Sequence, residues 1–143
     1  MTSTADRVIR YAGQDVRVLA DWPGQGQGFA MAELCVPAGF RGPPPHLHRD
    51  FDEGVYVLDG VLVVLDGEAE RTVPAGDLAI LPRGRRQSFG NPSARPARVL
   101  GIWSPPVGLR FLEDIGGLLT TQGEPDHDAL AEVYRRHNSA IVA

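Results

Sequence analysis

The chain has 143 residues, of which 43% are hydrophobic and 22% are charged, as in a single globular domain that buries a core without disulfides or a structural metal. Its formal net charge of -4 excludes the broad positive field that nucleic-acid binding requires. No run of about 18 apolar residues occurs, so we expect no membrane span.

Cysteine and lysine usage indicates the compartment and the source. The single cysteine, Cys35, cannot form an intrachain disulfide, and the first residues contain no apolar signal segment, so the sequence predicts a cytoplasmic protein. All 14 basic residues are arginine, a bias that GC-rich coding produces and that favours a bacterial source.

Short apolar segments separated by glycine and proline indicate an all-β fold. The chain contains 17 glycines and 12 prolines, and the segments between them are rich in β-branched and aromatic residues. In chain order, strands are predicted over residues 6–10, 15–20, 28–36, 54–58, 61–65, 69–73, 78–81, 86–90 and 97–103. Many short strands at this spacing are typical of a sandwich or barrel rather than of alternating strands and helices.

The segment 55–67 contains the clearest turns of the chain. Its apolar runs are separated by Asp59-Gly60 and are followed by Asp66-Gly67. Aspartate and glycine tolerate the positive φ of a tight hairpin turn, so these pairs predict two consecutive hairpin corners.

The pattern changes after about residue 115, where we place the end of the β-barrel. Apolar residues then recur at helical spacing at Leu130, Val133 and Tyr134. Asp126 stands where it can cap the first turn of that helix. The sequence therefore predicts a barrel over residues 1–115 and, within 116–143, a loop and one C-terminal α-helix packed on the barrel or on a partner subunit.

Two of the four histidines lie one residue apart, at His46 and His48. In an extended strand, residues i and i+2 project from the same face about 6.5–7 Å apart at Cα, so both imidazoles can reach one point. Glu53 follows after a short polar loop and opens the next predicted strand. Two imidazoles and one carboxylate form a facial triad that binds a divalent metal and leaves positions open, so we predict metal binding by these three residues.

The segments around these residues resemble the two sequence motifs of the cupin superfamily. The first motif corresponds to His46-x-His48-x4-Glu53-x6-Gly60. The second corresponds to Gly76-x5-Pro82-x-Gly84-x2-Gln87-x3-Asn91. Gly39, which would open the first motif, lies one residue further from the histidines than in the common pattern. The resemblance covers roughly residues 30–103, and with the trailing helix the chain is similar to the quercetin-dioxygenase-like monocupins of bacteria.

The resemblance implies a double-stranded β-helix (a jelly-roll barrel), often dimeric, with a divalent iron, zinc, manganese or nickel ion inside it. It also implies that Gln87 occupies the position of a metal ligand, where the family has a histidine. A glutamine oxygen is a weaker donor than imidazole towards such metals. Three alternatives stay open: Gln87 ligates the metal weakly, it orients water or substrate beside the metal, or the metal site has been lost.

Four further residues are candidates for the substrate pocket. Phe89 shares the strand alternation of Gln87, and Met31, Glu33 and Trp103 lie on other predicted strands. Ordinary core packing explains each of these four at least as well as substrate contact does.

The sequence and the resemblance together predict a metal-dependent enzyme acting on a small, oxygen-rich organic molecule, with Glu53 and Gln87 as the catalytic candidates. The expected chemistry is dioxygenase-like, or that of a polyketide cyclase or isomerase. The alternative is a non-catalytic, small-molecule-binding barrel with a degenerate metal site. Arg83, Arg85 and Arg86 form a basic turn, and its simpler interpretation is a solvated loop. The other interpretation is that one of them contacts an anionic substrate.

Overall fold

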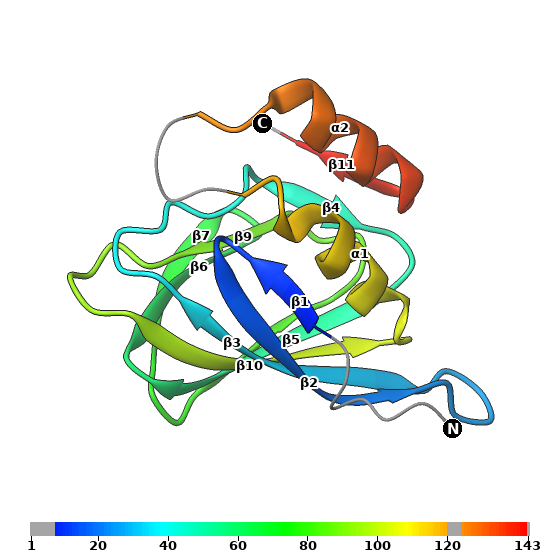
Figure 1. Cartoon of the computed structure of the whole chain (residues 1–143), viewed down its shortest axis with the longest axis horizontal. Coiled ribbons are helices and arrows are strands. Elements are labelled where there is room, and N and C mark those ends of the chain that lie inside the picture. Colours follow the sequence, from blue (N-terminus) through cyan, green and yellow to red (C-terminus); the bar gives the residue numbers. More distant parts are fainter. Residues whose placement is uncertain (1–7, 120–123, 143) are drawn as a thin grey trace.

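The structure is a computed structural model that describes residues 8–119 and 124–142, folded as two antiparallel sheets with two helices at one end (Figure 1). The elements up to the middle of the chain are β1 (Val8–Tyr11), β2 (Gln14–Trp22), β3 (Phe29–Val36), β4 (His46–His48), β5 (Asp52–Asp59) and β6 (Val61–Asp66). The remaining elements are β7 (Ala69–Pro74), β8 (Leu78–Leu81), β9 (Gln87–Gly90), β10 (Ala97–Ser104), α1 (Val107–Gly116), α2 (His127–Arg136) and β11 (Ser139–Ile141).

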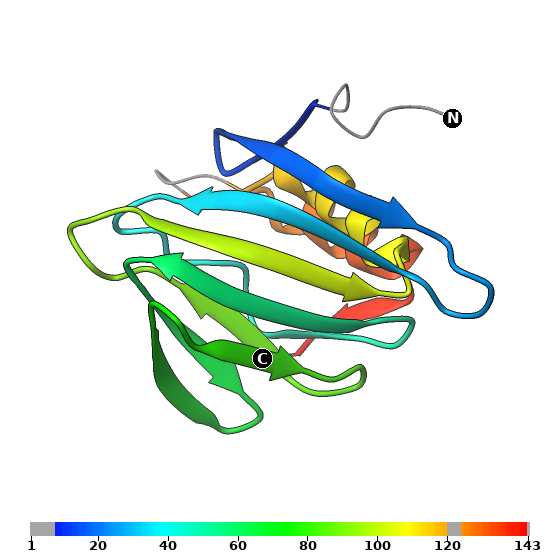
Figure 2. The same cartoon turned by 90° about the horizontal axis from the view of Figure 1, so that it is seen from below.

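Hydrogen bonding orders the strands β1-β2-β3-β10-β5-β8 in a six-stranded sheet and β11-β4-β9-β6-β7 in a five-stranded sheet. Figure 2 shows the six-stranded sheet with the helices behind it. Strands that are distant in sequence are neighbours in space, since β3 and β5 both pair with β10. Each of the nine predicted strands overlaps an observed one, and the all-β jelly-roll prediction is confirmed.

The core lies between the two sheets, and along strands such as β3, β6 and β10 every second residue is buried in it. On β6, for example, Leu62 and Val64 are fully buried, whereas Val63 and Leu65 are only partly buried on the outer face. Burial of one such aliphatic side chain stabilises the fold by about 1.5–3 kcal/mol. The position of a residue along its strand therefore decides whether its side chain faces the interior.

The structure contains two helices where the sequence predicted one. Helix α2 begins after Asp126, whose carboxylate accepts a hydrogen bond from the backbone N–H of Ala129 at 3.0 Å, as predicted. Helix α1 was not predicted, and it buries Leu109, Phe111 and Ile115. It packs against β1, β3 and β10 and covers one end of the barrel (Figure 1). The division placed after residue 115 falls in the last turn of this helix.

The C-terminal strand β11 completes the five-stranded sheet. It pairs antiparallel with β4, so that Ser139 lies opposite His48 and Ile141 lies opposite His46. Strand β11 therefore lies directly beside the strand that carries His46 and His48. Both helices of the described ranges are ten residues long, so neither has the length or the apolar run needed to cross a membrane.

Candidate metal centre

Strand β4 directs both of its histidines into the barrel. His46 is 4% exposed and His48 is 1% exposed, while Leu47 between them is only partly buried. Their ring centroids lie 4.7 Å apart. The spacing of one residue therefore brings both imidazoles to the same interior face, as the strand argument predicts.

Hydrogen bonds fix which ring nitrogen of each histidine is free. Nδ1 of His46 lies 2.9 Å from the carbonyl oxygen of Pro44, which only accepts, so this Nδ1 carries the proton. Nδ1 of His48 lies 2.7 Å from the Ser139 hydroxyl, which donates its own proton to the His137 carbonyl oxygen at 3.1 Å. His48 Nδ1 is then also a donor. In both rings Nε2 keeps its lone pair and is available to a metal.

Burial keeps both imidazoles neutral. Loss of solvation lowers the pKa of His46 to about 4, against a smaller opposing effect of the Pro44 carbonyl. Loss of solvation, followed by repulsion from His46 and His137, lowers the pKa of His48 to about 2. At neutral pH neither Nε2 is therefore protonated, which is the state that a metal ligand requires.

Glu53, on β5, brings a carboxylate to the two imidazoles. Its Oε2 lies 4.0 Å from Nε2 of His48, and its side chain is 13% exposed. The indole N–H of Trp103, its partner on β10, donates to Oε1 at 3.3 Å. Burial raises the pKa of Glu53 to about 7, and the Trp103 hydrogen bond only partly offsets this effect.

Gln87 lies opposite His46 in the pairing of β4 with β9 and is 2% exposed. Its carboxamide nitrogen is buried and has no hydrogen-bond partner among the described residues. The structure therefore brings Gln87 together with His46, His48 and Glu53, the four candidates for metal binding.

These side chains surround a central cavity of about 20 Å³. Its other lining residues are Tyr11, Pro43, Phe89, Trp103, Phe111, Leu112, Ile115, Leu119 and Tyr134. Of the four residues expected in a substrate pocket, Phe89 and Trp103 line this cavity. A cavity of this size has room for one water molecule or one metal ion, and an organic substrate does not fit without movement of its walls.

Met31 and Glu33 do not line the cavity, contrary to the expectation from the sequence. The inward positions of β3 are Ala30, Ala32 and Leu34, so that the alternation places Met31 and Glu33 on the outer face of the sheet. Apolar residues occupy both faces of this strand, and the pattern alone therefore leaves its register ambiguous.

Two aromatic residues of the helices close the cavity and were not among the predicted site residues. The Phe111 ring of α1 packs edge-on against His48, with centroids 4.6 Å apart. The Tyr134 ring of α2 lies 5.0 Å from His46 and nearly parallel to His48, at an interplanar angle of 10°. Burial, together with the nearby Glu53 carboxylate, raises the pKa of Tyr134, so the phenol stays protonated. Helical periodicity marked Tyr134 as a core residue, not as a site residue.

The donor atoms are of the types that bind a divalent ion, but they lie too far apart to coordinate one ion together. Donors about 2–2.2 Å from one ion lie roughly 3–3.4 Å from each other. Among the described residues, no group of three or more His, Cys, Asp or Glu side chains is placed closely enough to hold a metal ion. The 4.0 Å between His48 Nε2 and Glu53 Oε2 is wider than that spacing. A shift of the carboxylate by less than about 1 Å closes this gap, and two neutral imidazoles with one carboxylate suit iron, zinc, manganese or nickel.

Comparison with protein families identifies the fold family. A family model described as a cupin domain matches residues 32–103, half of the chain. The chain belongs to the cupin family. A solved cupin conserved-barrel protein from Salinispora arenicola aligns over 96% of both chains with a TM-score of 0.54 and 18% identity, a likeness that shows the fold.

Two curated relatives of this cupin carry names of redox enzymes. It is 34% identical over 93 residues to oxidoreductase iacF of Pestalotiopsis fici, and the match covers 59% of this chain and 46% of the relative. It is 35% identical over 88 residues to quercetin 2,3-dioxygenase of Bacillus subtilis, covering 59% of this chain and 25% of the relative. The cupin thus spans less than half the length of these two relatives.

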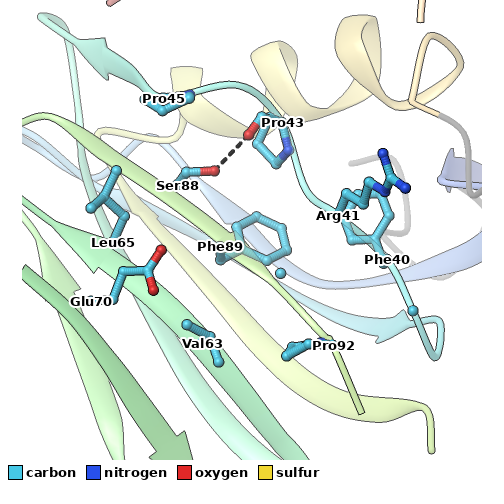
Figure 3. A pocket seen from close by; sticks show the side chains of 12 residues that line it. Phe40, Arg41, Pro43, Pro45, Val63, Leu65, Glu70, Ser88, Phe89 and Pro92 are labelled. Atoms are coloured by element: carbon cyan, nitrogen blue, oxygen red, sulfur yellow. Dashed lines mark hydrogen bonds between the residues drawn. The ribbon is translucent and has the colours of Figure 1, made fainter. Parts of the chain in front are cut away.

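A larger groove of about 650 Å³ lies on the outside of the cupin barrel (Figure 3). Its floor is largely apolar, with Val63 and Leu65 of β6 facing the loop that carries Pro43. Phe89 and Pro43 line both this outer groove and the central cavity, so they form part of the wall between the two. None of the candidate metal ligands lines the groove.

The three arginines of the basic turn are engaged with acidic side chains. Arg83 makes a bidentate contact with Asp52, and Arg85 forms an ion pair with Asp66. Arg86 lies near a third carboxylate. None of the three lines the central cavity, which agrees with the interpretation of a solvated loop.

Proposed function

We propose that this cupin is a metal-dependent enzyme acting on a small, oxygen-rich organic molecule, with dioxygenase-like or cyclase/isomerase-like chemistry. The observation that carries the proposal is the pair of buried imidazoles with free Nε2 atoms beside the Glu53 carboxylate. The relatives named as an oxidoreductase and a quercetin dioxygenase support the redox version.

His46, His48 and Glu53 would hold the divalent ion. A bound ion supplies Lewis acidity to a substrate oxygen and, for a redox-active metal, a means of dioxygen chemistry. The two imidazoles stay neutral, and their Nδ1–H groups fix the orientation of the rings. In the metal-free chain burial raises the pKa of Glu53 to about 7, and a bound ion would hold this carboxylate in its charged form as a ligand. The apolar walls of the cavity exclude bulk water.

A second candidate function, a non-catalytic binding cupin with a degenerate metal site, is favoured by three observations. Gln87 stands where the family has a histidine, the ligand set is not closed, and the central cavity is too small for an organic molecule. In this version a small molecule would bind in the outer groove, whose volume of about 650 Å³ lies in the range of ligand pockets.

Reconstitution of the metal-free chain separates the two functions. The untagged protein is loaded in turn with Fe(II), Mn(II), Ni(II) and Zn(II), and oxygen uptake and product formation are followed with flavonols and other enolisable phenols. We expect turnover only with metal, and a loss of at least about 100-fold in His46→Ala. His127→Ala is the matched control, because His127 is an exposed histidine of α2.

The binding function predicts a different pattern. Ligand affinity, measured by calorimetry, would persist in the metal-free protein and in His46→Ala, with no turnover under any metal. That pattern would contradict the enzymatic proposal.

A further inference from the structure

Two residues that line the central cavity each carry a buried polar atom without a hydrogen-bond partner. In the described part of the chain, three buried side-chain atoms lack such a partner: Asp66 Oδ1, Gln87 Nε2 and the Tyr134 hydroxyl oxygen. Asp66 is explained by the Arg85 guanidinium beside it. The polar atoms of Gln87 and Tyr134 have no such neighbour among the described residues, and both residues line the cavity that His46 and His48 line. A buried hydrogen-bond donor without an acceptor costs free energy of folding. An occupant of the cavity is therefore expected to accept hydrogen bonds from these two groups.

The cavity has the size and polarity of a site for one water molecule. Its volume of about 20 Å³ slightly exceeds the minimum that one water requires. A buried water also needs two to four polar partners. Gln87 and Tyr134 supply two donors, and the free Nε2 atoms of His46 and His48 supply acceptors.

Both groups are donors that favour an oxygen atom. A carboxamide N–H and a phenol O–H each donate to a lone pair, and the phenol is neutral in this environment. A water molecule, or a hydroxyl or carbonyl oxygen of an organic molecule, offers the same acceptor chemistry. The pair therefore selects an oxygen atom and leaves open whether it belongs to water or to a substrate.

The packing holds the two donors in place from different parts of the chain. Gln87 is fixed by strand pairing, as the partner of His46 across β4 and β9. Tyr134 is fixed by the aromatic contact of its ring with Phe111, at 5.1 Å between centroids. The short strand β11, which follows α2, anchors that helix to β4.

We propose that Gln87 and Tyr134 together bind one oxygen atom beside His46, His48 and Glu53. In the metal-free protein this atom is a water oxygen. During turnover it is a substrate oxygen, and this second half of the inference rests on the proposed enzymatic function. Gln87 is then a positioning residue that donates a hydrogen bond and is not a metal ligand. Tyr134 makes the C-terminal helix a part of the site.

Thermal unfolding of metal-free variants tests the resting site without any metal. Tyr134→Phe removes only the hydroxyl, and Gln87→Met removes the carboxamide at similar length. If the oxygen is bound, each change is expected to lower Tm by about 3 °C, since one hydrogen bond is lost. If the hydroxyl has no partner, Tyr134→Phe raises Tm, because a buried unbonded donor is removed, and the proposal is overturned. Tyr56→Phe, on the outer face of β5, is the matched control.

Two further measurements locate the oxygen and separate this proposal from the proposed function. A crystal structure of the metal-free protein is expected to show one solvent oxygen within about 3.2 Å of both donors, and an empty cavity would overturn the proposal. With Co(II) as the probe, Tyr134→Phe is expected to bind the ion with affinity reduced no more than about tenfold. Complete loss of Co(II) binding in this variant alone would show that Tyr134 is a metal ligand. It would overturn the assignment of Tyr134 as a hydrogen-bond donor. If the unaltered chain binds no Co(II), the enzymatic proposal fails, and the Tm comparison still decides the resting site.

Discussion

Glu53 is a carboxylic acid placed where its charged form is poorly solvated. Burial raises its pKa from the ordinary 4.5 to about 7 in the folded chain. Because the folded pKa lies above the unfolded one, this group stabilises the fold fully below pH 4.5, and the stabilisation is lost as the pH rises towards 7.

Glu53→Gln is therefore expected to change the pH dependence of stability in the metal-free protein. The variant keeps a neutral side chain at all pH values, so at about pH 8 it should be more stable than the unaltered protein by up to about 3 kcal/mol. At about pH 4 the two should have the same free energy of unfolding, because both side chains are then neutral. Urea unfolding at a series of pH values measures the difference, and a pH-independent difference would contradict the assignment.

Ser139 acts on the site through His48. Its hydroxyl accepts the Nδ1 proton of that ring at 2.7 Å and so directs the free Nε2 towards Glu53. Ser139→Ala should weaken metal affinity by about 10–100-fold, because removal of such an outer partner frees the ring. Competition titration against a chromophoric chelator measures the affinity. Ser93→Ala is the control, because it removes a hydrogen bond to Asn91 that lies away from the cavity. This variant should have an unchanged metal affinity.

The sequence allowed part of this site to be predicted at the level of single residues. The grouping of His46, His48 and Glu53 follows from the period of a strand and from the short loop between two strands. Ser139 and Tyr134 lie more than 80 positions further along the chain, and only tertiary packing brings them to the histidines. No local pattern carries that information.

At the scale of elements, helices α1 and α2 form a cap over the central cavity. Phe111 and Tyr134 fill the space above the imidazoles, and His137 Nε2 lies 2.7 Å from Asp114 Oδ2, which joins the two helices. Because the cavity holds only about 20 Å³, entry of an organic molecule requires this cap to move.

Asp114→Asn should make the cap open more often, since it removes the charged partner of His137. Hydrogen exchange of the α1 and α2 amides is expected to accelerate several-fold, while β3 and β10 keep their protection. Asp15→Asn, which removes an exposed ion pair with Arg10, is the control. Equal acceleration in both variants, or none in Asp114→Asn, would show that this contact does not hold the cap.

The elements differ in how far the sequence determines them. Glycine and proline mark the ends of most strands, and Asp126 marks the start of α2 through its side-chain hydrogen bond. Helix α1 has a signal in its sequence, since Leu109, Leu112 and Ile115 recur every three residues after Pro106. Strand β11 is only three residues long and is defined by its pairing with β4, so its own residues do not predict it.

At the scale of the whole molecule, the outer face of the six-stranded sheet is apolar at its β8 edge. Ile80 is 60% exposed and Leu78 is 44% exposed. Gly54, which has no side chain, pairs with Ile80 on one side and with Ile102 on the other. Such a surface is typical of a contact between subunits. We propose that two copies of the chain associate through this face and that the protein is a homodimer.

Sedimentation equilibrium tests the dimer. The unaltered chain should sediment at twice its mass of 15.4 kDa, and Ile80→Glu should produce the monomer, because a buried charge without a partner is costly at an interface. Val107→Glu, at an exposed position at the start of α1, should remain dimeric. A monomeric unaltered chain would refute the association.

We propose that His46, His48 and Glu53 hold one divalent ion inside the barrel. Equilibrium dialysis of the metal-free, untagged chain against Zn(II) or Co(II), followed by elemental analysis, measures this directly. We expect one ion per chain for the unaltered protein and for His127→Ala, and almost none for folded His46→Ala and His48→Ala. Folded, unaltered protein that retains no ion, or equal binding by His48→Ala, would contradict it.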